Sequence, residues 1–302
     1  MQKKENYIPI IKKTKNIKNV FKKPNWLKIT LPLNYKKIDI VKKKLRNNKL
    51  HSVCEEALCP NIHECFNNNT ATFMILGSVC TRKCPFCAVK KGRPTIPDIL
   101  EPEKLADVVV QMNLEYVVIT SVTRDDLKYG GVEHFIKCIQ EIRKRKNVKI
   151  EILVPDFKNC QNKVVDYLGI SLPDVFNHNI ESVPRLYKKI RPGADYISSL
   201  KLLKKFKKKY SNIETKSGLM LGLGEKKKEV LDVLYDLRSN GVTMLTLGQY
   251  LQPSSLHLKV KSYITQFEFN FFKKFALSIG FKNAFCGPLV RSSYHAYEQQ
   301  KK

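Results

Sequence analysis

The segment CTRKCPFC, residues 80–87, spaces three cysteines as C-x3-C-x2-C. Structural zinc sites use four ligands, usually as C-x2-C pairs or together with histidine. This segment offers three thiols, and no second C-x2-C pair follows it. Three thiolates on a cubane of four irons leave one iron free to chelate a cofactor and pass an electron to it. The spacing therefore predicts an iron–sulfur cluster with an open iron; a zinc site and a chance grouping are the alternatives.

A second group of three cysteines lies just upstream, in CEEALCPNIHEC, residues 54–65. Its spacing is C-x4-C-x5-C, and by the same count it predicts a second cluster that lacks one cysteine ligand. The chain has nine cysteines and shows no secretory signal, so metal or redox chemistry is favoured over disulfides. Three further cysteines stand singly and are expected to be buried apolar residues: Cys138, Cys160 and Cys286.

The elements that must position these thiols begin near residue 71. Short apolar runs alternate with helical patterns at a period of roughly 30 residues, which is typical of a parallel sheet covered by helices. The expected strands are residues 71–77, 116–122, 148–157, 174–180, 214–224 and 241–251. The expected helices between them are residues 101–112, 131–146, 160–170, 193–210 and 225–240. No Gly-x-Gly-x-x-Gly opens a helix after the first strand, so these six units favour a partial (βα)6 TIM-type barrel over a dinucleotide-binding sheet.

The chain is strongly basic, with a formal net charge of +28. Such a charge often marks a nucleic-acid-binding protein. Here the basic runs follow helical patterns without a shared aromatic motif, so solvated helix faces are favoured and no nucleic acid is expected. A basic surface also suits the capture of an acidic protein partner. No apolar run approaches the roughly 18 to 20 residues of a membrane helix, so we expect a cytoplasmic protein without a membrane span.

The cysteine loop directly follows the first expected strand, and in α/β barrels the C-terminal strand ends carry the chemistry. With Phe86 beside the last cysteine, this arrangement resembles the radical S-adenosylmethionine superfamily. From about residue 24 to its end, the chain resembles the lipoyl synthase family through the ordered motifs PNWLKITLP, CTRKCPFCAVKKGRP, ITSVTRDDL, FNHNIESVPRLY, RPGADY, KSGLMLGLGE, GQYLQPS and RSSYHA. Three positions depart from the family pattern without removing a ligand: His63 replaces glycine, Phe66 replaces tryptophan and Ala88 replaces aspartate.

The resemblance implies a reaction, its cofactors and its partners. Two [4Fe-4S] clusters and two S-adenosylmethionine molecules would insert sulfur at C6 and C8 of an octanoyl group linked to a lysine. The second cluster would donate the sulfurs and be degraded. The implied carriers are lipoyl domains of 2-oxoacid dehydrogenase E2 subunits and the glycine cleavage H protein. A low-potential donor such as flavodoxin or ferredoxin would supply electrons.

The same resemblance assigns roles to residues and regions. The cluster that cleaves S-adenosylmethionine would be held by Cys80, Cys84 and Cys87. The sulfur-donating cluster would be held by Cys54, Cys59, Cys65 and a serine of the C-terminal RSSY motif, Ser293, with Ser292 as the alternative. The pocket for S-adenosylmethionine or the octanoyl group would include Thr120, Ser121, Asn177, Glu181 and Arg191, with residues 218–224 beside the adenosine.

These roles divide the chain into three regions. Residues 1–70 would form a basic arm and the extension for the second cluster. Residues 71–265 would form the barrel, and residues 266–302 would complete the second cluster site.

Two other functions fit part of the pattern. A methylthiotransferase or a biotin-synthase-like enzyme also pairs two clusters, but it lacks the C-x4-C-x5-C triplet ahead of the radical cysteines. A zinc-stabilised, basic RNA-binding protein would be colourless, whereas two cubanes would give a brown protein with about eight irons.

Overall fold

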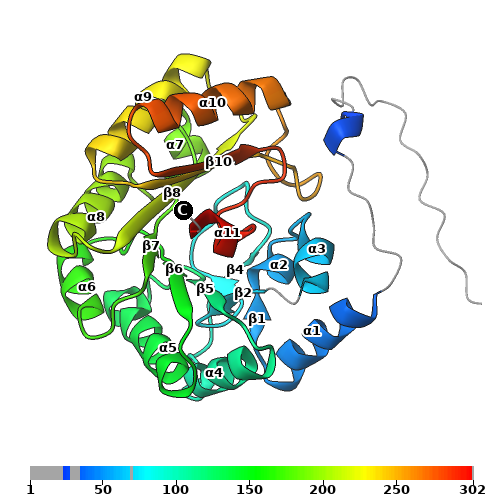
Figure 1. Cartoon of the computed structure of the whole chain (residues 1–302), viewed down its shortest axis with the longest axis vertical. Helices are drawn as coiled ribbons and strands as arrows, with labels where there is room; N and C mark the ends of the chain where they lie inside the picture. The colour runs from blue at the N-terminus through cyan, green and yellow to red at the C-terminus, as the bar shows by residue number, and fades with distance from the viewer. Residues whose placement is uncertain (1–22, 28–34, 69–70, 301–302) are drawn as a thin grey trace, which may run out of the picture.

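Eight strands form one sheet that curls into an incomplete ring (Figure 1). The computed structural model describes residues 23–27, 35–68 and 71–300. The strand order is β1-β2-β5-β6-β7-β8-β9-β10. Neighbouring strands from β2 to β10 are parallel, and β1 pairs antiparallel with β2. The bounds are β1 (His51–Ser52), β2 (Thr72–Ile75), β5 (Tyr116–Ser121), β6 (Lys149–Leu153), β7 (Val175–Asn177), β8 (Glu214–Leu221), β9 (Met244–Gln249) and β10 (Asn283–Gly287). A separate two-stranded ribbon consists of β3 (Val79–Cys80) and β4 (Lys90–Lys91).

Helices cover the outside of the ring (Figure 1). In α5 the buried residues Phe135, Ile136, Ile139 and Ile142 recur every three or four positions, so one face packs against the sheet. None of the helices in the part of the chain that is described combines the length and apolar character needed to cross a membrane. The outer helices are α4 (Glu101–Gln111), α5 (Val132–Arg145), α6 (Gln161–Leu168), α7 (Pro184–Ile190), α8 (Tyr196–Lys209), α9 (Lys227–Ser239) and α10 (Gln266–Ser278), with a short η2 (Lys128–Gly131) before α5.

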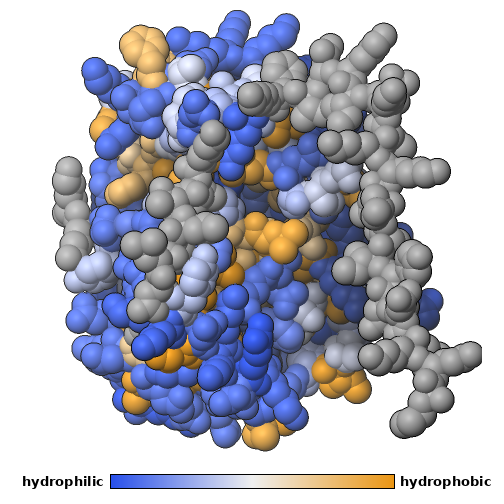
Figure 2. Space-filling model, turned by 90° about the vertical axis from the view of Figure 1, so that its right-hand side faces the viewer, coloured by the Kyte–Doolittle hydropathy of each residue, from blue (hydrophilic) through white to orange (hydrophobic). Residues whose placement is uncertain are grey.

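The N-terminal and C-terminal extensions both contact the ring. Ahead of β2 stand η1 (Asn25–Leu27), α1 (Lys36–Asn47), α2 (Val53–Glu56) and α3 (Ile62–Asn67). Figure 2 shows the face that lies on the right-hand side of Figure 1. Hydrophilic side chains cover most of this face, and hydrophobic ones gather near its middle. At the other end of the chain, α11 (Ala296–Gln300) lies within the ring in Figure 1. Ala296 packs against Tyr116 and Val118 of β5, so the C-terminal helix fills part of the interior.

The partial parallel barrel predicted from the sequence is confirmed. Each of the six expected strands and five expected helices contains an observed element of the same type. The pattern did not reveal β10, which extends the sheet in parallel beyond β9, nor the short β1 and α7. Cys138 is buried as expected, but Cys160 and Cys286 are only partly buried. The division into three regions stays a prediction, and most of the predicted basic arm lies outside the described residues.

A buried ion pair lies inside the ring, toward the N-terminal ends of the strands. The Lys216 ammonium contacts both oxygens of Glu151, at 3.0 and 3.1 Å, and neither side chain is exposed. The Tyr116 hydroxyl donates to Glu151 Oε2 at 2.8 Å, and the Asn177 amide donates to Oε1 at 2.7 Å. Glu151 therefore connects four strands through one carboxylate.

Lys216→Met is expected to lower the free energy of unfolding by about 3 to 5 kcal/mol, because it leaves a buried carboxylate without its counter-charge. The measurement is urea denaturation of the cluster-free protein. The matched control is Glu151→Gln combined with Lys216→Met. Glutamine keeps an acceptor for Tyr116 and can donate to Asn177 Oδ1, which has no partner in the described residues, so most of the stability should return. Wild-type stability in the single variant would contradict this account of the pair.

Candidate active site

A cavity of about 530 Å³ lies inside the ring, at the C-terminal ends of the strands. All six cysteines of the two triplets line it, and so does Ser293 of the C-terminal segment. Its walls also include Thr120, Leu153 and Met220, from the ends of β5, β6 and β8. Ligands of parallel α/β barrels bind at this end of the sheet. Two cysteine groups from different parts of the chain thus face one space.

The first triplet sits on a loop that is fixed to the β3–β4 ribbon. Cys80 ends β3, and its carbonyl accepts a hydrogen bond from the Gly92 N–H at 3.0 Å. Within the loop, the Cys87 N–H donates to the Cys84 carbonyl at 3.2 Å. These bonds form a turn that brings the last two thiols to the same cavity wall.

Arg82 anchors the cysteine loop to the barrel. Its guanidinium donates to Asp125 from Nε at 2.6 Å and to Asp156 from Nη2 at 2.9 Å, and Nη1 donates to the Gly193 carbonyl at 3.0 Å. Burial opposes the charge of Arg82, but the two carboxylates raise its pKa above the ordinary value. The loop is therefore tied to the ends of β5 and β6 by a permanent cation. Sequence reasoning gave Arg82 no role, although it lies between two cysteines.

The second triplet is carried by the short helices α2 and α3. Ser52 caps α2 by accepting a hydrogen bond from the Glu55 N–H at 3.3 Å. Cys54 lies in α2, Cys65 lies in α3, and Cys59 lies in the turn between them. In that turn the Cys59 N–H donates to the Cys54 carbonyl at 3.0 Å, so the first two thiols keep a fixed spacing.

The C-terminal segment is bound to the extension that carries the second triplet. The Asn61 amide donates to the Leu289 carbonyl at 2.7 Å. The Tyr294 hydroxyl donates to a carboxylate oxygen of Glu64 at 2.9 Å. Since Ser292 and Ser293 lie between these two contacts, both serines are held near the second triplet.

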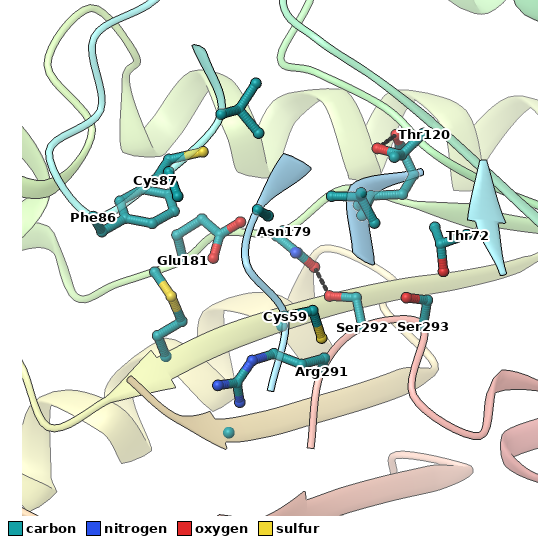
Figure 3. A pocket seen from close by; sticks show the side chains of 18 of the residues that line it. Cys59, Thr72, Phe86, Cys87, Thr120, Asn179, Glu181, Arg291, Ser292 and Ser293 are labelled. Atoms are coloured by element: carbon teal, nitrogen blue, oxygen red, sulfur yellow. Dashed lines mark hydrogen bonds between the residues drawn. The ribbon is translucent and has the colours of Figure 1, made fainter. Parts of the chain in front are cut away.

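The two serines differ in what they contact. The Ser292 hydroxyl donates to Asn179 Oδ1 at 2.7 Å (Figure 3). The Ser293 hydroxyl makes no hydrogen bond within the described residues, and Ser293 lines the cavity. Ser293 is therefore free to bind a ligand, whereas Ser292 holds the segment in place. This difference favours Ser293, the first choice from the sequence, over Ser292.

The C-terminal segment packs so closely against β9 that only glycine fits at position 248. This packing also places Arg291 in the cavity wall. A Cβ at Gly248 would lie 2.0 Å from the Val290 carbonyl oxygen, so any side chain there would displace the C-terminal segment. Arg291 Nη1 donates to that same carbonyl at 2.7 Å. Burial lowers the pKa of Arg291, while the nearby Cys59 and Glu181 favour its charge. Sequence reasoning did not identify Arg291 as part of the site.

Burial shapes the chemistry of the cysteine thiols. It raises the pKa of Cys54 to about 12 and that of Cys87 to about 11. The pKa is raised for the same reason in Cys59, Cys65 and Cys84. A buried thiol becomes a thiolate only beside a cation, and coordinated iron supplies that cation. The donor set therefore fits metal-bound thiolates better than free reactive cysteines.

The cysteine side chains are too far apart to bind a single metal ion, but they fit a cluster of several metal atoms. In the ranges that the structure describes, no three His, Cys, Asp or Glu side chains converge closely enough to hold one metal ion. Both triplets instead line the wall of the larger cavity. A cubane accepts ligands that are distributed around its corners. The residues present thus fit two iron–sulfur clusters, one at each triplet, in one cavity.

Four of the five residues predicted to bind S-adenosylmethionine or the octanoyl group line the cavity: Thr120, Ser121, Glu181 and Arg191. Thr120 Oγ1 donates to the Leu153 carbonyl at 2.9 Å, and the buried Ser121 hydroxyl has no partner among the described residues. Arg191 donates to the Asn179 carbonyl at 2.9 Å. Burial raises the pKa of Glu181, and the adjacent Arg191 opposes that shift.

The fifth predicted residue, Asn177, does not line the cavity, and its role in binding stays a prediction. Its side chain is fully buried beneath the cavity and donates a hydrogen bond to Glu151. Asn177 is the last residue of β7, so it lies deeper inside the ring than the residues that follow the strand. The next two residues, His178 and Asn179, line the cavity instead. His178 Nδ1 donates to the Val154 carbonyl at 2.8 Å, which leaves Nε2 without a partner in the described structure. Burial lowers the pKa of His178 to about 4, so Nε2 is a hydrogen-bond acceptor at neutral pH.

Comparisons with known proteins identify relatives of the chain. Residues 74–237 match the model of the Radical SAM superfamily, and residues 2–59 match the N-terminal domain of lipoyl synthase of the Radical_SAM family. A lipoyl synthase from Buchnera aphidicola subsp. Cinara cedri (strain Cc) is 64% identical over 292 residues, covering 97% of this chain and 94% of the relative. A lipoyl synthase from Pasteurella multocida (strain Pm70) is 58% identical over 302 residues, covering 99% and 93%.

Solved structures with little sequence identity share the fold. Streptococcus suis SuiB bound to S-adenosylmethionine has a TM-score of 0.56 at 14% identity and covers 82% of this chain and 61% of its own. Methylornithine synthase has a TM-score of 0.53 at 13% identity and covers 70% of each chain. At this level of identity, both similarities concern the fold alone.

Proposed function

The chain belongs to the lipoyl synthase family of the radical S-adenosylmethionine superfamily, and on that premise we propose how its residues share the reaction. The enzyme inserts sulfur at C6 and C8 of an octanoyl group carried on a lysine. When bound, two [4Fe-4S] clusters and S-adenosylmethionine supply the electron, the radical that breaks each C–H bond and the sulfur. No side-chain base removes a proton from unactivated carbon, so the residues bind, orient and shield these groups.

The first group of residues binds the cluster and the cofactor that start the reaction. Cys80, Cys84 and Cys87 would hold one cluster, and because the loop supplies only three thiolates, that cluster would keep a site for the cofactor. S-Adenosylmethionine carries both a carboxylate and an ammonium group. Arg191 suits the carboxylate and Glu181 suits the ammonium, since both side chains line the cavity beside the loop.

Polar groups without partners fit the rest of the cofactor. The Ser121 hydroxyl and His178 Nε2 are buried and line the cavity, and neither has a partner in the described residues. A ligand hydroxyl or amine that donates to His178 would remove the cost of burying that acceptor. We assign these groups, with Thr120, to the nucleoside of S-adenosylmethionine. Of residues 218–224, Gly218, Leu219 and Met220 line the cavity, and the predicted place of that run beside the adenosine stays part of this proposal.

The second group of residues binds the cluster that supplies sulfur. Cys54, Cys59 and Cys65 would hold this cluster together with Ser293, which would supply its fourth ligand. A serine alkoxide is a harder ligand than a thiolate and exchanges more readily, which suits a cluster that is consumed. Arg291 lies near Cys59 and compensates part of the negative charge of that cluster. The octanoyl chain occupies the cavity between the two clusters.

The substrates are octanoylated lipoyl carrier domains, and we propose those of 2-oxoacid dehydrogenase E2 subunits and the glycine cleavage H protein. Flavodoxin or ferredoxin is the proposed electron donor. We place the enzyme in the cytoplasm, because all nine cysteines are free and six are needed as thiolates, which reducing conditions preserve.

Capture of the carrier domain should depend on salt, since the enzyme carries a net charge of +28. The Debye length falls from about 10 Å at 0.1 M to about 3 Å at 1 M ionic strength. Over that range we expect the KM for an acidic octanoylated carrier domain to rise about tenfold. A short octanoyl-lysine peptide is the control, and its KM should change less than about twofold. Equal salt responses would show that the basic surface does not steer the carrier.

The observation that carries this function is that both cysteine triplets and Ser293 line one cavity. The test is anaerobic incubation of the reconstituted enzyme with an octanoyl-lysine peptide, reductant and S-adenosylmethionine. Mass spectrometry should find a peptide that has gained two sulfur atoms, together with 5′-deoxyadenosine. Cleavage of S-adenosylmethionine without any sulfur-containing peptide would contradict the proposed sulfur insertion.

A further inference from the structure

A second hollow, of about 210 Å³, lies on the outer side of the loop that carries Cys84 and Cys87. It is formed by α7 and by the segments that follow β8 and β9. Its floor is apolar and includes Ile190, Leu223 and Leu258. Three exposed lysines stand around it: Lys189, Lys259 and Lys261. The hollow shares no lining residue with the main cavity.

Only a thin layer separates this hollow from the first cysteine triplet. The Leu258 N–H donates to the Pro85 carbonyl at 3.2 Å, and Pro85 directly follows Cys84. Phe86 lines the main cavity on one side and packs against the cluster of Ile190, Leu223 and Tyr250 on the other. A protein seated in the hollow would therefore lie close to the first cluster without entering the substrate cavity.

The three lysines have no counter-charge of their own. No carboxylate lies within ion-pair distance of Lys189, Lys259 or Lys261 in the described part of the chain. The neighbouring acidic side chains are already engaged: Glu225 accepts hydrogen bonds from the Gly222 and Leu223 N–H groups, and Glu229 pairs with Arg185 at 2.7 Å. Three like charges around an apolar floor repel one another, so an anionic partner surface is favoured there.

We propose that this hollow is the docking site of the electron donor, an acidic, low-potential one-electron carrier protein of the flavodoxin type. The inference rests on the proposed function, because that reaction consumes one electron for each S-adenosylmethionine cleaved. No covalent bond forms or breaks at this step: the carrier loses one electron and the cluster held by Cys80, Cys84 and Cys87 gains it. The path runs from the hollow through the contact between Leu258 and Pro85.

Charge complementarity suits any acidic protein, and position selects the electron donor over the octanoylated carrier domain. The octanoyl chain must reach the space between the two clusters, so its carrier docks at the mouth of the main cavity. An electron needs only proximity to the cluster, which the hollow provides through Phe86 and Pro85. Separate docking places would let both acidic proteins bind at the same time.

The test reverses the charge of the hollow in one variant, Lys189→Glu/Lys259→Glu/Lys261→Glu. Binding of flavodoxin to the reconstituted enzyme is measured by calorimetry at low salt, and cluster reduction by reduced flavodoxin is followed by stopped-flow absorbance. We expect flavodoxin affinity to fall about tenfold or more, because like charges now face each other. The rate of reduction by flavodoxin should fall in parallel, while reduction by dithionite stays at the wild-type rate.

A matched control carries the same charge change on the exposed side of α8: Lys201→Glu/Lys204→Glu/Lys208→Glu. Its flavodoxin affinity should stay within about twofold of wild type, because the change lies outside the docking site. An equal loss in both variants, or no loss in the first, would overturn the docking site. So would a first variant that weakens binding of the octanoylated carrier domain instead. Failure of the dithionite-reduced wild type to thiolate an octanoyl-lysine peptide would refute the proposed function rather than this site.

Discussion

Cys80→Ala is expected to reduce formation of 5′-deoxyadenosine to background. Cys59→Ala is expected to keep cleavage of S-adenosylmethionine but to stop sulfur insertion. The reason lies in the position of the two triplets, which occupy separate elements around one cavity. Loss of a thiolate beside the open iron removes the group that binds the cofactor. Loss of a thiolate from α2, α3 or the turn between them removes only the sulfur source. Liquid chromatography quantifies 5′-deoxyadenosine, and mass spectrometry quantifies the product.

Cys160→Ala is the matched control, because Cys160 is a partly buried cysteine outside both triplets. It should retain both activities. The other members of each triplet should behave like their own group: Cys84 and Cys87 like Cys80, and Cys54 and Cys65 like Cys59. If substitutions in both triplets eliminated cleavage equally, the division of labour between two clusters would be wrong.

Ser293→Ala should cleave S-adenosylmethionine at the wild-type rate yet deliver little or no sulfur. The three cysteines of the second triplet would leave one iron without a ligand, and Ser293 is the cavity-lining hydroxyl of the C-terminal RSSY motif that makes no hydrogen bond within the described residues. Ser293→Cys should assemble a stable cluster but release its iron more slowly, because a thiolate is a softer ligand for iron than an alkoxide. Single-turnover reactions followed for thiolated peptide and for free iron distinguish the two variants.

Ser292→Ala provides the comparison within the same motif. It removes the hydrogen bond to Asn179, which is worth about 1 kcal/mol, and should loosen the C-terminal segment without removing a cluster ligand. Its product yield should fall far less than that of Ser293→Ala. The reverse order of effects, or full product yield from Ser293→Ala, would transfer the ligand role to Ser292.

Local patterns in the sequence were enough to predict most of the barrel. Strands such as β5 are nearly continuous apolar runs, since both faces of a parallel sheet are buried, and helices such as α5 repeat apolar residues every three or four positions. The strand β10 was not predicted, because NAFCG contains Asn and Gly, which are uncommon in strands. Its place depends on pairing with β9, a contact that no local pattern encodes.

Within the site, the sequence predicted the six cysteines that line the cavity. It did not predict which of the neighbouring polar side chains reach the cavity and which are buried beneath it. Asn177 and His178 are adjacent in one motif, yet Asn177 lies beneath the cavity and His178 lines it. Which residue reaches the cavity depends on where β7 ends relative to its neighbours, and that is a tertiary property. Arg291 was missed for a similar reason. Its role depends on docking of the C-terminal segment against Gly248, which is far away in the sequence.

The central claim is that the cluster at the second triplet supplies the inserted sulfur, whereas the cluster at the first triplet generates the radical. The most direct measurement is a single turnover of enzyme reconstituted with heavy-isotope sulfide and then freed of unbound sulfide. The reaction mixture contains only ordinary sulfur otherwise. The account predicts that both sulfur atoms in the thiolated octanoyl peptide carry the heavy isotope. Product that contains ordinary sulfur, formed at the same yield, would contradict it, because the sulfur would then come from solution rather than from the cluster beside Ser293.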